Sequence, residues 1–256
     1  MKLFDRAGVT LLALLMLATT SLAAEVPAAE EAAQTVPVAQ TQETEDWKLL
    51  LVNPWNPLPE NYTVTLKRLA NGLQVDERIY DDLNAMLIDC HNAGLFPVVC
   101  SAYRSHATQT RLHNNKIARL RAAGYGYDAA VKEAGRWVAA PGTSEHETGM
   151  ALDLVSYRYQ LLNSKQADTA EQKWLMEHCW EYGFILRYPT DKTEITGIGY
   201  EPWHYRYVGR ETAAKLHESG LCLEEYLTAL TAEAVETPEP VPVAETLPLV
   251  PTAQTA

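Results

Sequence analysis

The 256-residue chain lacks several features that would place it in common protein classes. It has no basic stripe, and its 33 acidic residues outnumber 21 basic ones for a net charge of −12. Nucleic acid is therefore not expected as a partner. No internal repeat and no regular alternation of strands with helices is visible. The apolar run at residues 9–18 is too short for a membrane span, which needs about 20 residues.

Cysteine is also scarce, and its spacing argues against one common metal site. The four cysteines, Cys90, Cys100, Cys179 and Cys222, contain no Cys-x-x-Cys pair, which disfavours a zinc–thiolate site. In an exported protein an even number of cysteines favours disulfides, and four cysteines allow three pairings. The sequence does not select one. The short loop between Cys90 and Cys100 favours that bridge, together with a Cys179–Cys222 bridge.

The two ends of the chain differ in composition from its middle. Residues 1–23 combine early basic residues, an apolar run and small residues before a cleavage point, which predicts a secretory signal peptide. An uncleaved N-terminal anchor is the alternative, and the absence of a nearby cysteine argues against a lipoprotein. Residues 24–46 and 232–256 carry acids and prolines but no base or aromatic, so both are predicted to be disordered.

The remaining segment, residues 47–231, is predicted to be one domain. It is long enough for a single hydrophobic core, and its 22 acids and 19 bases give a net charge near −3. Because helices and strands do not alternate regularly, we expect an α+β fold with a mostly antiparallel sheet flanked by helices. The predicted helices are 76–93, 106–122, 127–138, 169–182, 210–219 and 223–230. The predicted strands are 49–53, 96–100, 150–155, 183–187, 195–197 and 203–208.

Two short segments contain the residue types of a catalytic zinc site. His146 and Asp153 lie before and within one predicted strand, and His204 lies at the start of another. Two neighbouring strands can aim such side chains at one point. Two imidazoles and a carboxylate leave one zinc position open for water. The segment is not the His-Glu-x-x-His helix motif, because Met150 stands four residues after His146.

A further carboxylate completes this set. Glu201 precedes His204 by three residues, and the intervening Pro202 disfavours a helix, so a turn is expected to place Glu201 beside the metal site. There it could accept a proton from a metal-activated water and pass it to the leaving amine. Glu145 and Glu147, on either side of His146, are interpreted as solvated neighbours.

Several stretches of the chain together resemble one known family, the VanY-type D-alanyl-D-alanine carboxypeptidases. The resemblance rests on residues 101–105 with Gln109, on 141–153, on 182–189 and on 201–209, in that order and at compatible spacing. It implies the small α+β fold shared with hedgehog-type domains and DD-peptidases. It also implies an extracytoplasmic zinc peptidase that removes D-Ala from peptidoglycan stem peptides or their precursors, and we expect a monomer.

The resemblance also implies roles for individual residues. His146, Asp153 and His204 match the family's zinc ligands, and Glu201 matches its catalytic base. Arg104 matches an arginine near the scissile carbonyl, where it could bind the substrate carboxylate or the developing oxyanion. Ser144 and Gln109 match substrate contacts, and Tyr103 and Trp203 are added as candidate pocket residues. Trp203 and Tyr207 could equally be core residues, and Ser144 could be a turn or cap residue.

Three other functions share parts of this pattern. An L,D-carboxypeptidase that acts on tetrapeptide stems would keep the same motifs. A wall-binding module without turnover would keep the fold, although binding alone does not require Glu201. A signalling protein of hedgehog type would rest on fold analogy alone.

Overall fold

The structure is a computed structural model, and it describes residues 47–236. The predicted signal peptide (1–23), the predicted linker (24–46) and the predicted tail from residue 237 onward lie outside the described residues. Helix α7 (Leu223–Glu236) continues past residue 231, where the sequence analysis places the end of the domain.

A four-stranded antiparallel sheet organises the described part of the chain. Its strands follow the order β3-β4-β6-β5, and every neighbouring pair is antiparallel. Strands β1 and β2 form a separate antiparallel hairpin. The bounds are β1 (Leu66–Arg68), β2 (Gln74–Asp76), β3 (Pro97–Ser101), β4 (Ala151–Ser156), β5 (Phe184–Leu186) and β6 (His204–Tyr207). The predicted α+β class with a mostly antiparallel sheet is confirmed.

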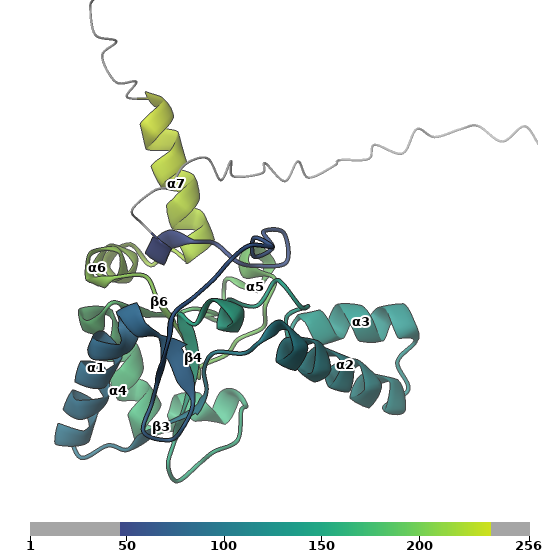
Figure 1. Cartoon of the computed structure of the whole chain (residues 1–256), viewed down its shortest axis with the longest axis horizontal. Coiled ribbons are helices and arrows are strands. Elements are labelled where there is room, and N and C mark those ends of the chain that lie inside the picture. Colours follow the sequence, from purple (N-terminus) through teal and green to yellow (C-terminus); the bar gives the residue numbers. More distant parts are fainter. Residues whose placement is uncertain (1–46, 237–256) are drawn as a thin grey trace, which may run out of the picture. The chain divides into compact units, whose positions relative to one another are not determined.

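Helices lie on both sides of this sheet. Helices α1 and α4 pack on one side, and α2 and α3 form a pair on the other (Figure 1). The remaining bounds are α1 (Tyr80–Asn92), α2 (His106–Ala122), α3 (Tyr127–Gly135), α4 (Ala170–His178), α5 (Thr193–Thr196) and α6 (Arg210–Ser219). Short 3₁₀ helices are η1 (Trp47–Leu49), η2 (Glu77–Ile79), η3 (Glu145–Thr148), η4 (Ser164–Asp168) and η5 (Cys179–Tyr182).

The main core lies between the sheet and helices α1 and α4. Strand β4 is buried at all six positions, as expected for a central strand that is covered on both faces. Leu83 and Met86 of α1 pack there with Leu152 and Leu154 of β4. This packing fixes β4, and β4 in turn carries Asp153.

Helix α2 has the bounds that the sequence predicts, because its start is encoded locally. Ser105 precedes the helix, and its hydroxyl accepts a hydrogen bond from the backbone N–H of Thr108. Such an N-cap satisfies one of the donors that a helix start leaves free. The cap follows directly after Arg104, so it also fixes where α2 leaves the site.

Three predictions about local structure are wrong or incomplete. Residues 49–53 do not form a strand, because Arg206 Nη2 donates to the carbonyls of Lys48 and Leu50 in place of a strand partner. Residues 195–197 belong to a helical turn, α5, that ends at Gly197 in the left-handed region. The β1–β2 hairpin was missed, although Asn71-Gly72 is a common hairpin-turn sequence.

The predicted disulfides are absent from the structure, in which all four cysteines are free thiols. Cys90 is buried in helix α1. Cys100 lies in β3 at a shift of register between Val99 and Ser101, and it has no partner residue in β4. Cys100 is exposed, whereas Cys90 is buried. Cys179 and Cys222 are both buried.

No helix within residues 47–236 is long and apolar enough to cross a membrane.

Candidate active site

The register of two central strands places an acid directly opposite a histidine. Asp153 of β4 pairs with His204 of β6 in the antiparallel ladder. Directly opposed residues have Cβ atoms about 4.5–5.5 Å apart, so their side chains meet on one face of the sheet. His204 Nδ1 lies 3.3 Å from Asp153 Oδ1.

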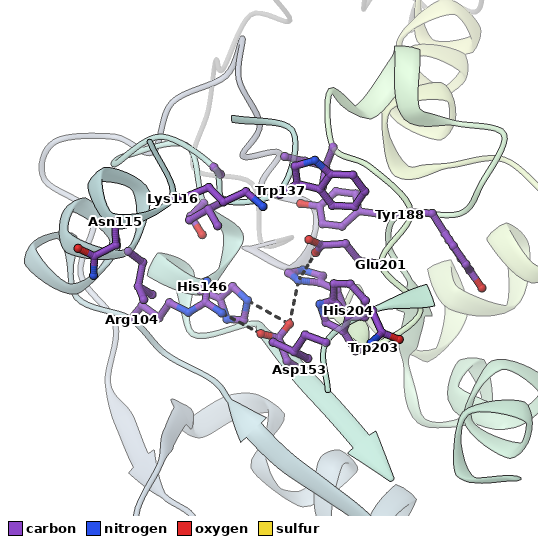
Figure 2. A pocket seen from close by; sticks show the side chains of 18 of the residues that line it. Arg104, Asn115, Lys116, Trp137, His146, Asp153, Tyr188, Glu201, Trp203 and His204 are labelled. Carbon is purple, nitrogen blue, oxygen red and sulfur yellow. Dashed lines mark hydrogen bonds and ion pairs between the residues drawn. The ribbon is translucent and has the colours of Figure 1, made fainter. Parts of the chain in front are cut away.

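A short helix before β4 supplies the second histidine. His146 lies in η3, which ends at Gly149 with φ near 79°. A Cβ at Gly149 would lie 2.9 Å from the backbone nitrogen of Asp76, so this tight return to β4 requires glycine. The turn brings His146 Nε2 to 3.3 Å from Asp153 Oδ1 (Figure 2).

The arrangement of lone pairs at this site favours a cation. His146 Nδ1 lies 2.8 Å from the carbonyl oxygen of Ala102 and must carry a proton to donate to it. Burial lowers the pKa of His146 to about 4, and Arg104 acts in the same direction. His146 is therefore neutral at pH 7, and the lone pair of Nε2 faces the carboxylate of Asp153. Two facing lone pairs repel unless a positive charge lies between them.

The donor atoms also fit a zinc ion by distance. His146, Asp153 and His204 are all buried, and one ligand atom from each lies within 4.8 Å of the others. Two of the separations are 3.3 Å, close to the ~3.4 Å between ligands of a tetrahedral zinc with bonds of ~2.1 Å. Asp153 Oδ1 has no hydrogen-bond partner among the described residues. These three residues could hold a metal ion.

His204 lies in a strongly acidic environment. Burial opposes its charged form, but the carboxylates of Asp153 and Glu145 raise the pKa of His204 to about 9. His204 Nε2 faces Glu145 Oε2 at 3.5 Å. The same carboxylates that favour a proton on His204 would favour a metal cation in its place.

Glu201 lies beside this cluster. Its carboxylate is 3.7 Å from His204 Nδ1, and its side chain is only 8% exposed. Burial raises the pKa of Glu201 to about 8, and Asp153 adds to that rise while His204 and Arg104 oppose it. A cation at the triad would lower this pKa again. Glu201 is therefore in a position to exchange a proton near neutral pH.

Arg104 connects the site to helix α2. Its Nη2 donates to Asp153 Oδ2 at 2.8 Å, and its Nε donates to the hydroxyl of Ser101. Its Nη1 lies 3.4 Å from Gln109 Oε1. These bonds orient Asp153, and they use three of the five N–H groups of the guanidinium. The side chain also lines the cavity described next, where the remaining donors can reach a ligand.

A cavity of about 680 Å³ opens over the cluster. Its floor includes the three metal-site residues and Glu201, and its walls include Ser144, Trp203 and Trp137. Ser144 is buried, and its hydroxyl makes no hydrogen bond to any residue within 47–236. The cavity is large enough for a short peptide end.

Two of the predicted substrate contacts lie elsewhere. Gln109 is fully buried behind Arg104, and its amide donates to the carbonyl of Ala139. Tyr103 follows β3 and is not among the residues that line the cavity. Tyr207 belongs to the main core, and its hydroxyl donates to Asp82.

The interpretation of Glu145 and Glu147 as solvated residues is wrong, because both are buried. Glu145 Oε1 accepts from Arg187 Nε and from Arg206 Nη1, both at 2.8 Å. Although burial opposes ionisation, the two guanidinium groups hold the pKa of Glu145 well below its usual range. Arg187 also pairs with Glu224 of α7. Glu145 thus faces His204 from the centre of a buried ionic network.

Replacing Glu145 with glutamine should destabilise the protein strongly. The change would leave Arg187 and Arg206 without a shared carboxylate inside the protein, and breaking a buried ion pair from one side costs about 3–5 kcal/mol. Chemical denaturation would measure the loss. Glu211→Gln, which breaks an exposed pair with Lys215, serves as control and should not change the midpoint. Equal midpoints for the two variants would contradict a structural role for Glu145.

Sequence reasoning also missed a residue that packs on the site. Tyr188 lines the cavity, and its ring lies 4.7 Å from that of His204 between centroids. It follows Arg187 directly and belongs to the 182–189 stretch that carries the family resemblance. The family resemblance of that stretch could therefore have indicated that Tyr188 lies near the site, although it assigns the tyrosine no role.

Comparisons with known proteins identify similar carboxypeptidases. The family model described as VanY, D-alanyl-D-alanine carboxypeptidase, matches residues 72–210. A D-alanyl-D-alanine carboxypeptidase of Enterococcus faecalis is 44% identical over 183 residues, which are 72% of this chain and 66% of that protein. The chain thus spans slightly less than two thirds of this relative.

Solved structures extend the comparison to the fold. One is a variant of the vancomycin resistance D,D-pentapeptidase VanY from a VanB-type cassette in complex with Zn(II). It is 44% identical, with a TM-score of 0.65, over 71% of this chain and 99% of that one. Another is the LD-carboxypeptidase LdcB, 32% identical with a TM-score of 0.59, over 70% of this chain and 84% of that one. The first of these solved chains is matched over almost its whole length.

Proposed function

Because the chain belongs to the VanY family of D-alanyl-D-alanine carboxypeptidases, we propose that it hydrolyses the terminal D-Ala-D-Ala bond of peptidoglycan stem peptides. The observation that carries this proposal is the position of Glu201 beside the His146, Asp153 and His204 cluster, at the floor of a cavity. The proposed cofactor is Zn²⁺, held by these three residues. The family resemblance predicted from the sequence is confirmed.

A bound zinc ion would supply a Lewis acid for the scissile carbonyl and for the attacking water. The side chains of the chain itself supply the other steps. Glu201 takes a proton from the attacking water and later gives it to the leaving amine of D-Ala. Its burial raises its pKa toward the pH at which both transfers are efficient.

Arg104 and Ser144 are the proposed polar contacts of the substrate. Arg104 keeps N–H donors free after it has bonded to Asp153. These donors can stabilise negative charge that develops on the scissile carbonyl oxygen. The unbonded hydroxyl of Ser144 can reach the terminal carboxylate. Gln109 is proposed to act through Arg104, as a positioning residue, while Trp203 contacts the substrate as part of the wall.

An L,D-carboxypeptidase that acts on tetrapeptide stems is the second candidate, because LdcB shares the fold at 32% identity. The higher identity to the D,D-acting enzyme favours the first candidate. A test is to incubate the protein, with its metal content measured, with tripeptide, tetrapeptide and pentapeptide stems and to identify the released amino acid. D-Ala from the pentapeptide alone is expected. Cleavage of only the tetrapeptide would select the second candidate, and no cleavage of any stem would favour a wall-binding module.

We also propose that the protein acts outside the cytoplasm, as the predicted signal peptide at residues 1–23 suggests. Its partners are then stem peptides of the cell wall or their exported precursors.

Removing residues 237–256 should leave cleavage of the pentapeptide unchanged. All residues that line the cavity lie between Arg104 and His204, and the truncation keeps the whole of α7. The ratio kcat/KM of the truncated and full-length proteins would measure the effect. A tenfold loss would mean that the tail takes part in substrate binding.

A further inference from the structure

One wall of the cavity is a single face of helix α2. The cavity-lining residues of this helix are Leu112, Asn115, Lys116 and Arg119. Their spacing of three and four residues places them on one side of the helix. Beyond Leu112 this face is polar and basic. Leu162, Asn163 and Ser164, which also line the cavity, are uncharged.

Positive charge dominates this part of the cavity. The acidic residues that line the cavity are Asp153 and Glu201, and both belong to the floor. Neither Lys116 nor Arg119 forms an ion pair with a carboxylate in the part of the chain that the structure describes. Lys116 extends from α2 toward the side of the cavity that holds Trp137 (Figure 2), and its Nζ lies 5.7 Å from the centre of that ring.

The length of this wall suits several residues of an extended peptide. A helix rises 1.5 Å per residue, so Leu112 and Arg119 are about 10 Å apart along the axis. Extended chain covers that distance with about three residues. The leaving D-Ala occupies only one residue length beside the metal cluster. The basic wall is therefore available to residues that precede the scissile bond.

We infer that Lys116 and Arg119 form a subsite for a carboxylate on an upstream residue of the stem peptide, and that this subsite selects diaminopimelate over lysine at the third position. The inference rests on the proposed carboxypeptidase function. The side chain of diaminopimelate ends in an ammonium and a carboxylate on the same carbon, whereas that of lysine ends in an ammonium alone. Only diaminopimelate therefore offers Lys116 and Arg119 an anionic partner that offsets the repulsion of its ammonium. The D-glutamate at the second position carries a carboxylate as well, so the test must separate binding of that carboxylate from binding of the one at the third position.

The expected effect is moderate, because Arg119 is exposed and exposed ion pairs contribute little. A cavity with low-dielectric walls strengthens the field of its charges. Together the two side chains should favour the diaminopimelate stem about tenfold in kcat/KM, with most of the change in KM. The preference should shrink as salt is raised, since screening weakens exposed charges.

The test compares four pentapeptide stems: diaminopimelate at the third residue, the same stem with that side chain amidated, lysine at the third residue, and the diaminopimelate stem with isoglutamine at the second. The variants are Arg119→Gln and the double variant Lys116→Gln/Arg119→Gln. Arg119→Gln is the cleaner one, since Lys116 also influences Glu201. Arg111→Gln is the matched control, because Arg111 is exposed on the same helix but does not line the cavity.

The double variant should lose the preference for diaminopimelate over lysine, and Arg111→Gln should keep it. The inference would be overturned if the double variant lost kcat/KM equally on the diaminopimelate and lysine stems. It would also be overturned if the unmodified protein showed no preference between them. If isoglutamine at the second residue lowers kcat/KM but amidation at the third residue does not, the assignment to diaminopimelate would be overturned.

Binding separates failure of the subsite from failure of the proposed function. Calorimetry on zinc-loaded Glu201→Ala, with and without the two α2 substitutions, gives Kd for the same stems without turnover. If the unmodified protein cleaves no stem, the proposed function fails. A tenfold Kd preference that depends on Lys116 and Arg119 would still support the subsite, and equal Kd values would overturn it.

Discussion

Glu201→Ala should lower kcat at least about a hundredfold while the protein still binds zinc at full stoichiometry. General acid–base catalysis contributes about 10²–10⁴ in rate. Glu201 is the only carboxylate lining the cavity, apart from Asp153, among the described residues. Its 3.7 Å distance from His204 Nδ1 places it next to the metal site. Rates measured with the pentapeptide stem, together with the metal content, check this result.

Glu201→Gln is the matched control for this prediction. It keeps the volume and polarity of the side chain, but its amide replaces one carboxylate oxygen by an NH2 group and cannot take up the proton. Both variants should therefore be slow, with KM changed far less than kcat. A glutamine variant that turns over near the normal rate would remove Glu201 from the proton transfer.

His204→Ala should lose zinc as well as activity. It removes one of three donors from a buried cluster and leaves Glu145 Oε2 and Asp153 Oδ1 without the imidazole between them. Two donors would remain, and structural or catalytic zinc in proteins has three or four protein ligands. Metal analysis after dialysis against a weak chelator would show the loss directly.

His178→Ala provides the comparison for His204→Ala. His178 pairs with Glu181 at the surface, away from the cavity. It should keep both zinc and turnover. Full zinc stoichiometry in His204→Ala would contradict ligation by this residue.

The positions of the metal-site residues in the sequence predict that they meet, because two of them lie in strands that pair directly. Asp153 lies within a strand of buried residues, and His204 begins another strand, so antiparallel pairing brings them together. His146 needed the tight turn at Gly149 as well, which the sequence contains but does not by itself interpret. The buried pattern of β4 and the cap at Ser105 made the elements around the site predictable.

What the sequence did not predict depends on contacts between distant residues. Glu145 looks like a surface acid beside His146, and only Arg187 and Arg206, 42 and 61 residues away, explain its burial. The strand predicted at residues 49–53 does not form for a similar reason, because the carbonyl of Leu50 accepts a hydrogen bond from Arg206, 156 residues away. The predicted Cys90–Cys100 bridge does not form: Cys90 is buried in α1, whereas Cys100 is exposed at a register shift in β3 that the sequence does not reveal.

The ionic network around Glu145 connects the final helix to the metal site. Arg187 donates hydrogen bonds to Glu224 of α7 and to Glu145, and Glu145 faces His204. No residue of α7 lines the cavity. Even so, a truncated form of this chain that is meant to keep the metal site should retain α7 rather than end after His204. A protein fused to the C-terminal side should be attached after residue 236.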